Sequence, residues 1–257
     1  MKIFKAIAIA FSTYSKIPMP IFEWKDEDLR YSLCFFPWVG AVIGEGIWLW
    51  FRLSVRLGVN TLTYVLIAAA IPLLVTGGIH VDGYMDSMDA FHSYQPRERK
   101  LEILKDAHIG AFSVIMLGVF GLIYVAGFAQ ITDSRTLLVF CFGFFLARCL
   151  SGIGVVSLPA AKNEGMLYRF ASSAEQRWVK LVLYAQLVLC CGLMICISWK
   201  SALVLIATAL FSYAYYCYRS NRELGGITGD TAGYFVTICE GAMVVAAAAV
   251  SIAIQSM

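Results

Sequence analysis

The chain has 257 residues, of which 60% are hydrophobic and 14% are charged, and its formal net charge is +3. Soluble domains are about 45–50% apolar and ~25% charged, and a water-soluble globule of this size could not bury so much apolar surface. The composition also excludes a disordered chain and an alternating β-barrel, and the small net charge gives no reason to expect nucleic acid as a partner. Long apolar runs predict an all-α, polytopic helical membrane protein.

The chain begins with a short segment that bears lysines and continues with seven long apolar segments. Residues 1–20 contain three lysines and end in Pro-Met-Pro, which predicts an N-terminal interfacial helix. Each later segment approaches the ~20 residues that a membrane-spanning helix needs. The seven predicted spans are Phe35–Val55, Leu62–Gly78, Ile109–Gln130, Thr136–Leu158, Leu181–Ser198, Ala202–Tyr218 and Ala232–Gln255. No repeat or linker divides residues 1–257, so a single membrane domain is expected.

The lysines and arginines are divided unequally between the connections, and this asymmetry predicts the orientation. If the N-terminus is cytoplasmic, only four of the 20 basic residues lie in outside connections, and Arg148 lies within a span. The four outside residues are Arg52, Arg56, Arg135 and Lys200. The long polar connections 79–108 and 159–180 then face the cytoplasm, and so do the residues that could carry chemistry.

Three aspartates follow the second predicted span at i, i+4 and i+7 spacing, in the stretch Gly77–Asp89. On a helix, Asp82, Asp86 and Asp89 fall on one face, where their mutual repulsion favours a positive neighbour, either a Lys or Arg side chain or a divalent metal. Mg²⁺ or Mn²⁺ prefers such oxygen ligands, together with water and substrate phosphates. A solvated helix face is the alternative. His80 is a candidate ligand or proton carrier, or only an interfacial hydrogen-bonding group.

Glycines and a basic-acidic pair lie near these aspartates. Gly77, Gly78 and Gly83 permit close approach of the backbone to a phosphate or to a neighbouring helix, so they are candidate substrate-binding positions. Lys105 and Asp106 lie at the mouth of the third predicted span, on the same side as the aspartates. We therefore treat this pair as candidate catalytic residues.

A second polar cluster, Arg222–Thr231, precedes the last predicted span. Its glycines and threonines stand at a predicted helix start, where exposed N–H groups and hydroxyls suit a phosphate cradle. The candidate substrate-binding residues of this cluster are Arg222, Gly226, Thr228 and Gly229. Asp230 is either a further catalytic carboxylate or a helix cap.

Glu45, Arg148 and Glu240 fall well inside predicted spans, away from the span ends. An intramembrane ionisable residue is a functional candidate, and a structural ion pair is the alternative. Most other charges cluster at span ends on one side of the membrane. This pattern favours a phosphoryl-transfer enzyme over a transporter, which would place its ionisable residues near the bilayer midplane.

The motifs resemble those of the cobalamin synthase family, adenosylcobinamide-GDP ribazoletransferase. The stretches that carry the resemblance run in order through nearly the whole chain: Ser15–Pro20, Phe36–Gly40, Gly77–Asp89, Leu101–Phe112 and Gly225–Thr231. The resemblance implies a Mg²⁺-dependent enzyme of the bacterial cytoplasmic (inner) membrane that works at the cytoplasmic face. Such an enzyme joins adenosylcobinamide-GDP to α-ribazole or its 5′-phosphate and releases GMP. Other cobamide-pathway enzymes are expected partners, and the oligomeric state is left open.

The resemblance also implies roles for individual residues. Asp82, Asp86 and Asp89 would hold Mg²⁺ on the diphosphate. Lys105 and Asp106 would serve the same site, and Gly229 and Asp230 would complete it. With His80, these give the candidate catalytic set His80, Lys105, Asp106 and Asp230.

Three positions depart from the family pattern. Ala90 stands where glycine is frequent, Ala107-His108 where Ser-Arg is frequent, and Thr237 where an acidic residue is frequent. The last departure puts a helical acidic pair in doubt and leaves Glu240 as the single carboxylate there.

Two other functions fit part of the pattern. A CDP-alcohol phosphotransferase would also hold a metal on aspartates in a membrane, but its usual motif has Ala-Arg where this chain has Asp86-Ser87. A non-catalytic permease for cobamides or metal ions predicts flux of the substrate without release of GMP.

Overall fold

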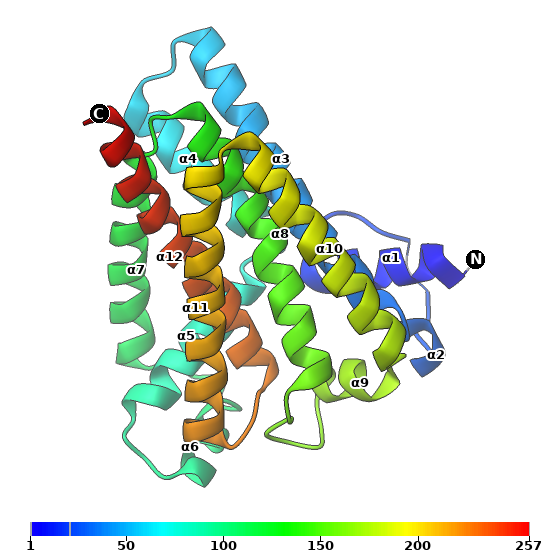
Figure 1. The fold of residues 1–257 in the computed structure, drawn as a ribbon. Helices are drawn as coiled ribbons and strands as arrows, with labels where there is room; N and C mark the ends of the chain where they lie inside the picture. Colours follow the sequence, from blue (N-terminus) through cyan, green and yellow to red (C-terminus); the bar gives the residue numbers. More distant parts are fainter. Residues whose placement is uncertain (1, 21, 257) are drawn as a thin grey trace.

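The computed structural model describes residues 2–20 and 22–256, and this part of the chain is helical almost throughout, with no β-strand (Figure 1). The helices are α1 (Lys2–Tyr14), α2 (Asp26–Leu29), the 3-10 helix η1 (Ser32–Phe35), α3 (Phe36–Leu57), α4 (Thr61–Thr76), α5 (Ile79–His92), α6 (Arg97–Ile103), α7 (Ala111–Ala129), α8 (Ser134–Ser157), α9 (Met166–Ser173), α10 (Gln176–Ile197), α11 (Trp199–Leu224) and α12 (Gly229–Gln255). The predicted all-α class is confirmed.

Six helical segments of the described chain are long and apolar enough to cross a membrane. They are α7, α8, α10, α11, α12 and the segment 26–57, which ends in α3. The second predicted span corresponds to α4, which joins α5 through a bend of 92°. Counting this broken pair as one span, with α4 as its apolar part, gives the predicted seven. The protein is therefore a multi-pass membrane protein.

The break between α4 and α5 is made by two glycines. Gly77 and Gly78 both have left-handed backbone angles, with φ of 64° and 82°. Residues with a Cβ rarely adopt this conformation, so the pair ends α4 and lets α5 start in a new direction. The predicted glycines thus turn the chain at the point where the acidic stretch begins.

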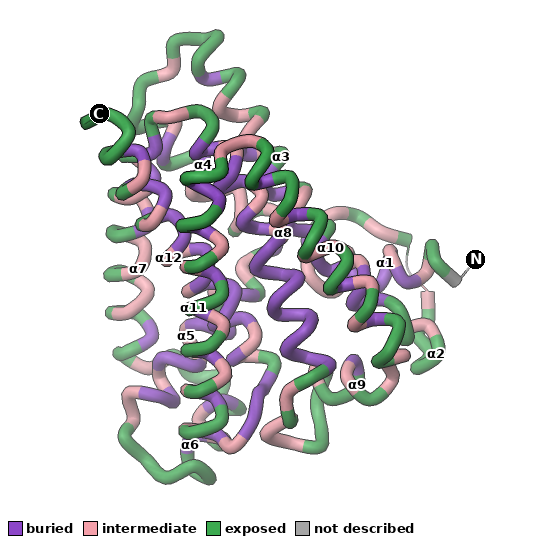
Figure 2. The backbone as a smooth tube through the Cα atoms, in the orientation of Figure 1, coloured by how far each residue is buried: buried purple, intermediate pink, exposed green. Residues whose placement is uncertain are grey.

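The core of the bundle is α8, which is buried along most of its length (Figure 2). It packs against α3, α10, α11 and α12. Gly40 and Gly44 let α3 approach α8 closely, because a Cβ at either position would overlap the α8 backbone at Phe144 or Cys141. Small residues are common where membrane helices touch. The hydrophobic effect does not drive helices together within lipid, so close packing of their backbones must provide the attraction.

Replacing Gly40 by valine should separate α3 from α8 and lower the thermal stability of the purified protein. The added atoms would meet backbone, which cannot move aside as a side chain can. Gly118→Val is the matched control, since a Cβ there meets no described atom within 4 Å. Melting temperatures in detergent compare the two. Equal stability of the two variants would contradict the close α3–α8 contact.

The connections at the two ends of the bundle differ in character. The short α3–α4, α7–α8 and α10–α11 connections lie together at one end, and α5, α6, α9 and the start of α12 lie toward the other (Figure 1). The helix α1 runs across the direction of the spans at the side of the bundle, as expected of an interfacial helix (Figure 1). The polar connections predicted to share one side of the membrane therefore lie at the same end of the bundle.

Candidate active site

The centre of the candidate site is the place where α5 crosses the start of α12. Gly83 packs on the backbone of Asp230, and Gly233 packs on the backbone of His80, so that neither position has room for a Cβ without adjustment. The hydroxyl of Thr237 donates a hydrogen bond of 3.0 Å to the carbonyl oxygen of His80. Close packing of the two helices thus joins two motifs that lie about 150 residues apart in sequence.

Three carboxylates from the two motifs share this crossing, and we call Asp82, Asp86 and Asp230 the acidic cluster. The pKa of Asp86 is raised to about 6, first by burial and then by the charges of Asp82, Asp230 and Asp89, in that order. A cation would relieve this repulsion. Asp230, which sequence alone left as a catalyst or a cap, therefore belongs to the same electrostatic group as the first motif.

The third aspartate of the first motif has a structural partner. Asp89 accepts hydrogen bonds from the backbone N–H groups of Gly110 at 2.8 Å and Ser113 at 2.9 Å. It thereby satisfies the otherwise unpaired N–H groups at the start of α7. Its predicted role as a metal ligand stays a prediction, and its observed role is to fasten α7 to α5.

The donor chemistry of the acidic cluster fits a magnesium ion. Within residues 2–20 and 22–256, no group of three or more His, Cys, Asp or Glu residues lies so that together they could hold a metal ion. Mg²⁺ does not need such a group, because it usually takes one or two carboxylates and fills its other positions with water and substrate phosphates. The cluster therefore offers donors of the kind that Mg²⁺ takes, and Mg²⁺ as the cofactor stays a prediction.

Two loop lysines lie on this side of the molecule. Lys162 donates to the carbonyl oxygen of Leu101 at 2.8 Å. Burial lowers the pKa of Lys162 and Lys105 lowers it further, while the charge of Asp230 works in the opposite direction. Lys105 forms an exposed ion pair of 2.6 Å with Glu164. Lys162 is thus a cation near the acidic cluster that sequence reasoning did not single out.

The other member of the predicted catalytic pair has a local partner. The carboxylate of Asp106 accepts from the backbone N–H of His108 at 3.0 Å and contacts its Nδ1 at 2.6 Å. Both side chains are exposed. The structure therefore does not place Asp106 in the acidic cluster, and its catalytic role stays a prediction.

The glycine-threonine turn before α12 is held by backbone pairing. Ile227 donates to the carbonyl of Pro159 at 2.9 Å and accepts from the N–H of Ala161 at 2.8 Å, which fixes the turn beside the loop that carries Lys162. Gly226 fits against this loop without room for a Cβ, whereas Gly229 is exposed and open.

Two other predicted residues of this turn have local partners. Thr228 is the N-cap of α12 and accepts from Thr231 N–H at 3.1 Å. Arg222 donates to the Tyr218 hydroxyl at 2.7 Å on its own helix. Of the four residues in Arg222–Thr231 that the sequence predicts to bind substrate, Gly229 has the most open surroundings.

A cavity of about 220 Å³ opens beside the acidic cluster, and we call it the aromatic cavity. Asp82 and Asp230 line it together with the rings of Tyr14, Phe36, His80 and Phe170. These rings come from α1, α3, α5 and α9. Sequence reasoning missed Tyr14, Phe36 and Phe170, because an aromatic residue in an apolar segment gives no signal that distinguishes a cavity wall from core packing.

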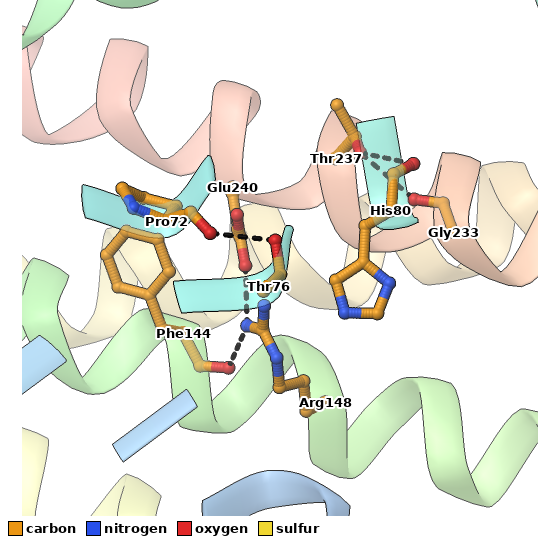
Figure 3. A network of polar contacts seen from close by, with 8 residues as sticks. All are labelled: Pro72, Thr76, His80, Phe144, Arg148, Gly233, Thr237 and Glu240. Carbon is orange, nitrogen blue, oxygen red and sulfur yellow. Dashed lines mark hydrogen bonds and ion pairs between the residues drawn. The ribbon is translucent and has the colours of Figure 1, made fainter. Parts of the chain in front are cut away.

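A buried ion pair lies behind the site, within the bundle (Figure 3). Arg148 Nη1 of α8 contacts Glu240 Oε1 of α12 at 2.6 Å and donates to the carbonyl of Phe144 at 3.0 Å. The two side chains are 1% and 10% exposed. The structure thus joins two intramembrane residues for which the sequence left the pairing open.

The ion pair borders a second cavity, of about 340 Å³, which we call the lateral cavity. Its walls are apolar residues of α4 and α7, and several of them, such as Leu66 and Leu73, are also exposed on the outer face of the bundle. His80 lines both cavities and is the side chain that they share.

The family model of CobS, cobalamin-5-phosphate synthase, matches residues 6–248 of the chain. The chain belongs to the cobalamin-5-phosphate synthase family. The match covers the α4–α5 break, the acidic cluster and the turn before α12, so the family pattern and the site coincide.

Relatives in several bacteria bear one name, adenosylcobinamide-GDP ribazoletransferase. The protein of Lachnoclostridium phytofermentans is 40% identical over 240 residues, which are 93% of this chain and 92% of the relative. That of Clostridium perfringens strain 13 is 31% identical over 93% of this chain and 96% of the relative. That of Listeria monocytogenes is 32% identical over 89% of this chain and 91% of the relative. No solved structure gives a significant match.

Proposed function

We propose that this member of the cobalamin-5-phosphate synthase family is an adenosylcobinamide-GDP ribazoletransferase. The names of its relatives support this activity, and the observation that carries the mechanism is the convergence of Asp82, Asp86 and Asp230 beside a cavity. In the reaction, a ribazole hydroxyl attacks the phosphorus attached to cobinamide. The bond from that phosphorus to the GMP oxygen breaks, GMP leaves, and the hydroxyl proton passes to a carboxylate of the cluster.

Each part of the site has a task in this reaction. Of Asp82, Asp86 and Asp230, one or two would hold Mg²⁺, which when bound neutralises diphosphate charge and activates phosphorus toward attack. Lys162 lies near Asp230 and adds positive charge for the departing phosphate. The open backbone of Gly229, at the N-terminus of α12, offers N–H groups to phosphate oxygens.

The test of this function is product formation by the purified protein in liposomes. We expect release of GMP only when adenosylcobinamide-GDP and α-ribazole or its phosphate are both present. Release of CMP from a CDP-alcohol instead would assign the protein to the other class of membrane phosphotransferase. Substrate flux across the liposome without any GMP would point to a permease and overturn the proposal.

Removal of divalent metal should abolish turnover, and added Mg²⁺ should restore it. The acidic cluster alone repels a diphosphate, so the reaction needs a cation between the two. Activity is measured after EDTA treatment and again after titration with MgCl₂, with KCl of equal ionic strength as the control. Full turnover in EDTA would contradict a metal held by these carboxylates.

We also propose that the protein lies in the bacterial inner membrane and that its acidic cluster is on the cytoplasmic side. Cysteines placed at exposed Tyr94 and Asn163 should then react with a membrane-impermeant thiol reagent only from the cytoplasmic side. A cysteine at exposed Arg135, at the start of α8, should react only from the opposite side. The reagent is applied to intact cells and to inverted vesicles. The reverse pattern would overturn this orientation.

A further inference from the structure

We propose that the aromatic cavity binds the base of ribazole and so positions the nucleoside for attack. This inference rests on the proposed function and assigns one of its two substrates to a place in the fold. The acidic motifs concern the diphosphate, whereas the inference about the base starts from the rings that line the cavity beside them.

The rings stand close enough to form one aromatic wall. The centroid of Tyr14 lies 4.3 Å from that of Phe36, 5.9 Å from Phe170 and 6.3 Å from His80. The centroids of Phe36 and His80 are 5.7 Å apart. A flat aromatic ligand gains stacking and edge contacts from such walls. Because these rings come from four helices, the wall forms only when the bundle is assembled.

The position of the cavity matches the geometry that the reaction requires. Asp82 and Asp230 line the same cavity as the aromatic rings. A nucleoside whose base lies among the rings would have its ribose hydroxyls near these two carboxylates. Binding of the base therefore presents the attacking hydroxyl to the group that would hold the metal and accept the proton.

The polarity of the cavity favours the ribazole base over guanine, the other base in the reaction. Apart from the two carboxylates, its polar side chains are few: Thr13, Tyr14, His80 and Ser151. Guanine carries several donors and acceptors along its edge, and leaving them unpaired is costly. A benzimidazole linked to ribose has only one free polar ring atom, an acceptor nitrogen.

His80 has a group suited to that nitrogen. The side chain is 8% exposed, and its Nε2 has no hydrogen-bond partner among the described residues. A buried ring nitrogen without a partner is unusual in a folded protein and points to a ligand. The tautomer with a proton on Nε2 would donate to the free nitrogen of the base.

The first test compares two phenylalanines, one from each cavity. Phe170→Leu should raise the KM for α-ribazole by about tenfold, the loss expected for one stacked ring, while the KM for adenosylcobinamide-GDP stays within about twofold. Phe120→Leu removes a ring from the lateral cavity and should change neither KM. Tyr14→Leu gives a second variant of the aromatic cavity if Phe170→Leu does not fold.

The second test measures whether His80 contacts the free nitrogen of the base, by comparing the rates with two substrates that differ at that atom. The wild type should prefer benzimidazole riboside to an indole analogue in which carbon replaces the free nitrogen. His80→Phe should lose most of this preference, whatever its effect on kcat. A merely structural histidine would lower both rates and leave their ratio unchanged.

Three outcomes would overturn the inference while leaving the transferase activity intact. A raised KM for adenosylcobinamide-GDP in Phe170→Leu would place guanine in the aromatic cavity. A raised ribazole KM in Phe120→Leu alone would place the base in the lateral cavity. Unchanged ribazole KM values in both Phe170→Leu and Tyr14→Leu would exclude base binding by these rings. Absence of GMP release by the wild type would instead reject the proposed function.

Discussion

Replacing Asp82 or Asp230 by asparagine should lower kcat/KM by more than tenfold, a loss above ~1.4 kcal/mol of transition-state stabilisation. Each change keeps the shape of the side chain and removes the charge that a metal and the departing proton require. The two residues belong to α5 and α12, so similar losses would show that both helices serve one centre. The measurement is the initial rate of GMP release by purified variants.

Asp26→Asn is the matched control for these variants. Asp26 is 72% exposed and forms only a surface ion pair with Arg169, so its charge should not affect the rate. Thermal stability of all three variants shows whether a low rate reflects misfolding. Retention of more than about a tenth of wild-type activity by Asp82→Asn would count against a direct role of this carboxylate in catalysis.

Arg148→Leu should strongly destabilise the folded protein. It leaves the Glu240 carboxylate buried within the bundle without its cation, and breaking a buried pair in this way costs roughly 3–5 kcal/mol. We expect a sharp fall in melting temperature and in the yield of folded protein in detergent.

The double variant Arg148→Leu with Glu240→Leu separates charge from packing. It removes both buried charges, and an apolar pair of this kind is often as stable as the ion pair that it replaces. The double variant should therefore regain much of the stability that the single variant loses. A single variant as stable as the wild type, or a double variant no better than the single one, would contradict a structural role of the pair.

Long apolar runs carried enough information to predict most of the bundle. The predicted spans Thr136–Leu158 and Ala232–Gln255 agree closely with α8 and α12, because the length of an apolar run sets the length of a spanning helix. The predicted span Ala202–Tyr218 is shorter than the helix that contains it, because α11 continues through polar residues to Leu224. Hydropathy marks the part within lipid, and not the helical turns beyond it.

The direction of α5 was beyond prediction from hydropathy. The sequence predicts close backbone approach at Gly77 and Gly78, but a pair of glycines permits many bend angles and does not determine which one forms. That angle depends on packing against α12, where Gly83 meets Asp230. The shared face of Asp82 and Asp86 was predictable because it follows from helical spacing alone.

The features of the site that the sequence does not predict are contacts between segments that are distant along the chain. The position of Asp89 on the helix face was clear, but its bonds to Gly110 and Ser113 depend on the approach of α7. Arg148 and Glu240 are both functional candidates because they lie within apolar segments, yet only the assembled bundle shows that they pair. In each case the local pattern identifies a residue, and tertiary packing decides its partner.

The most direct measurement of the central claim is the stoichiometry of the reaction catalysed by wild-type protein in liposomes with Mg²⁺. Mass spectrometry follows the joined cobamide product while released GMP is quantified in the same sample. The proposed transfer predicts one GMP for each molecule of cobinamide joined to ribazole, and neither product without both substrates. GMP formed without ribazole, or a joined product formed without GMP, would contradict it.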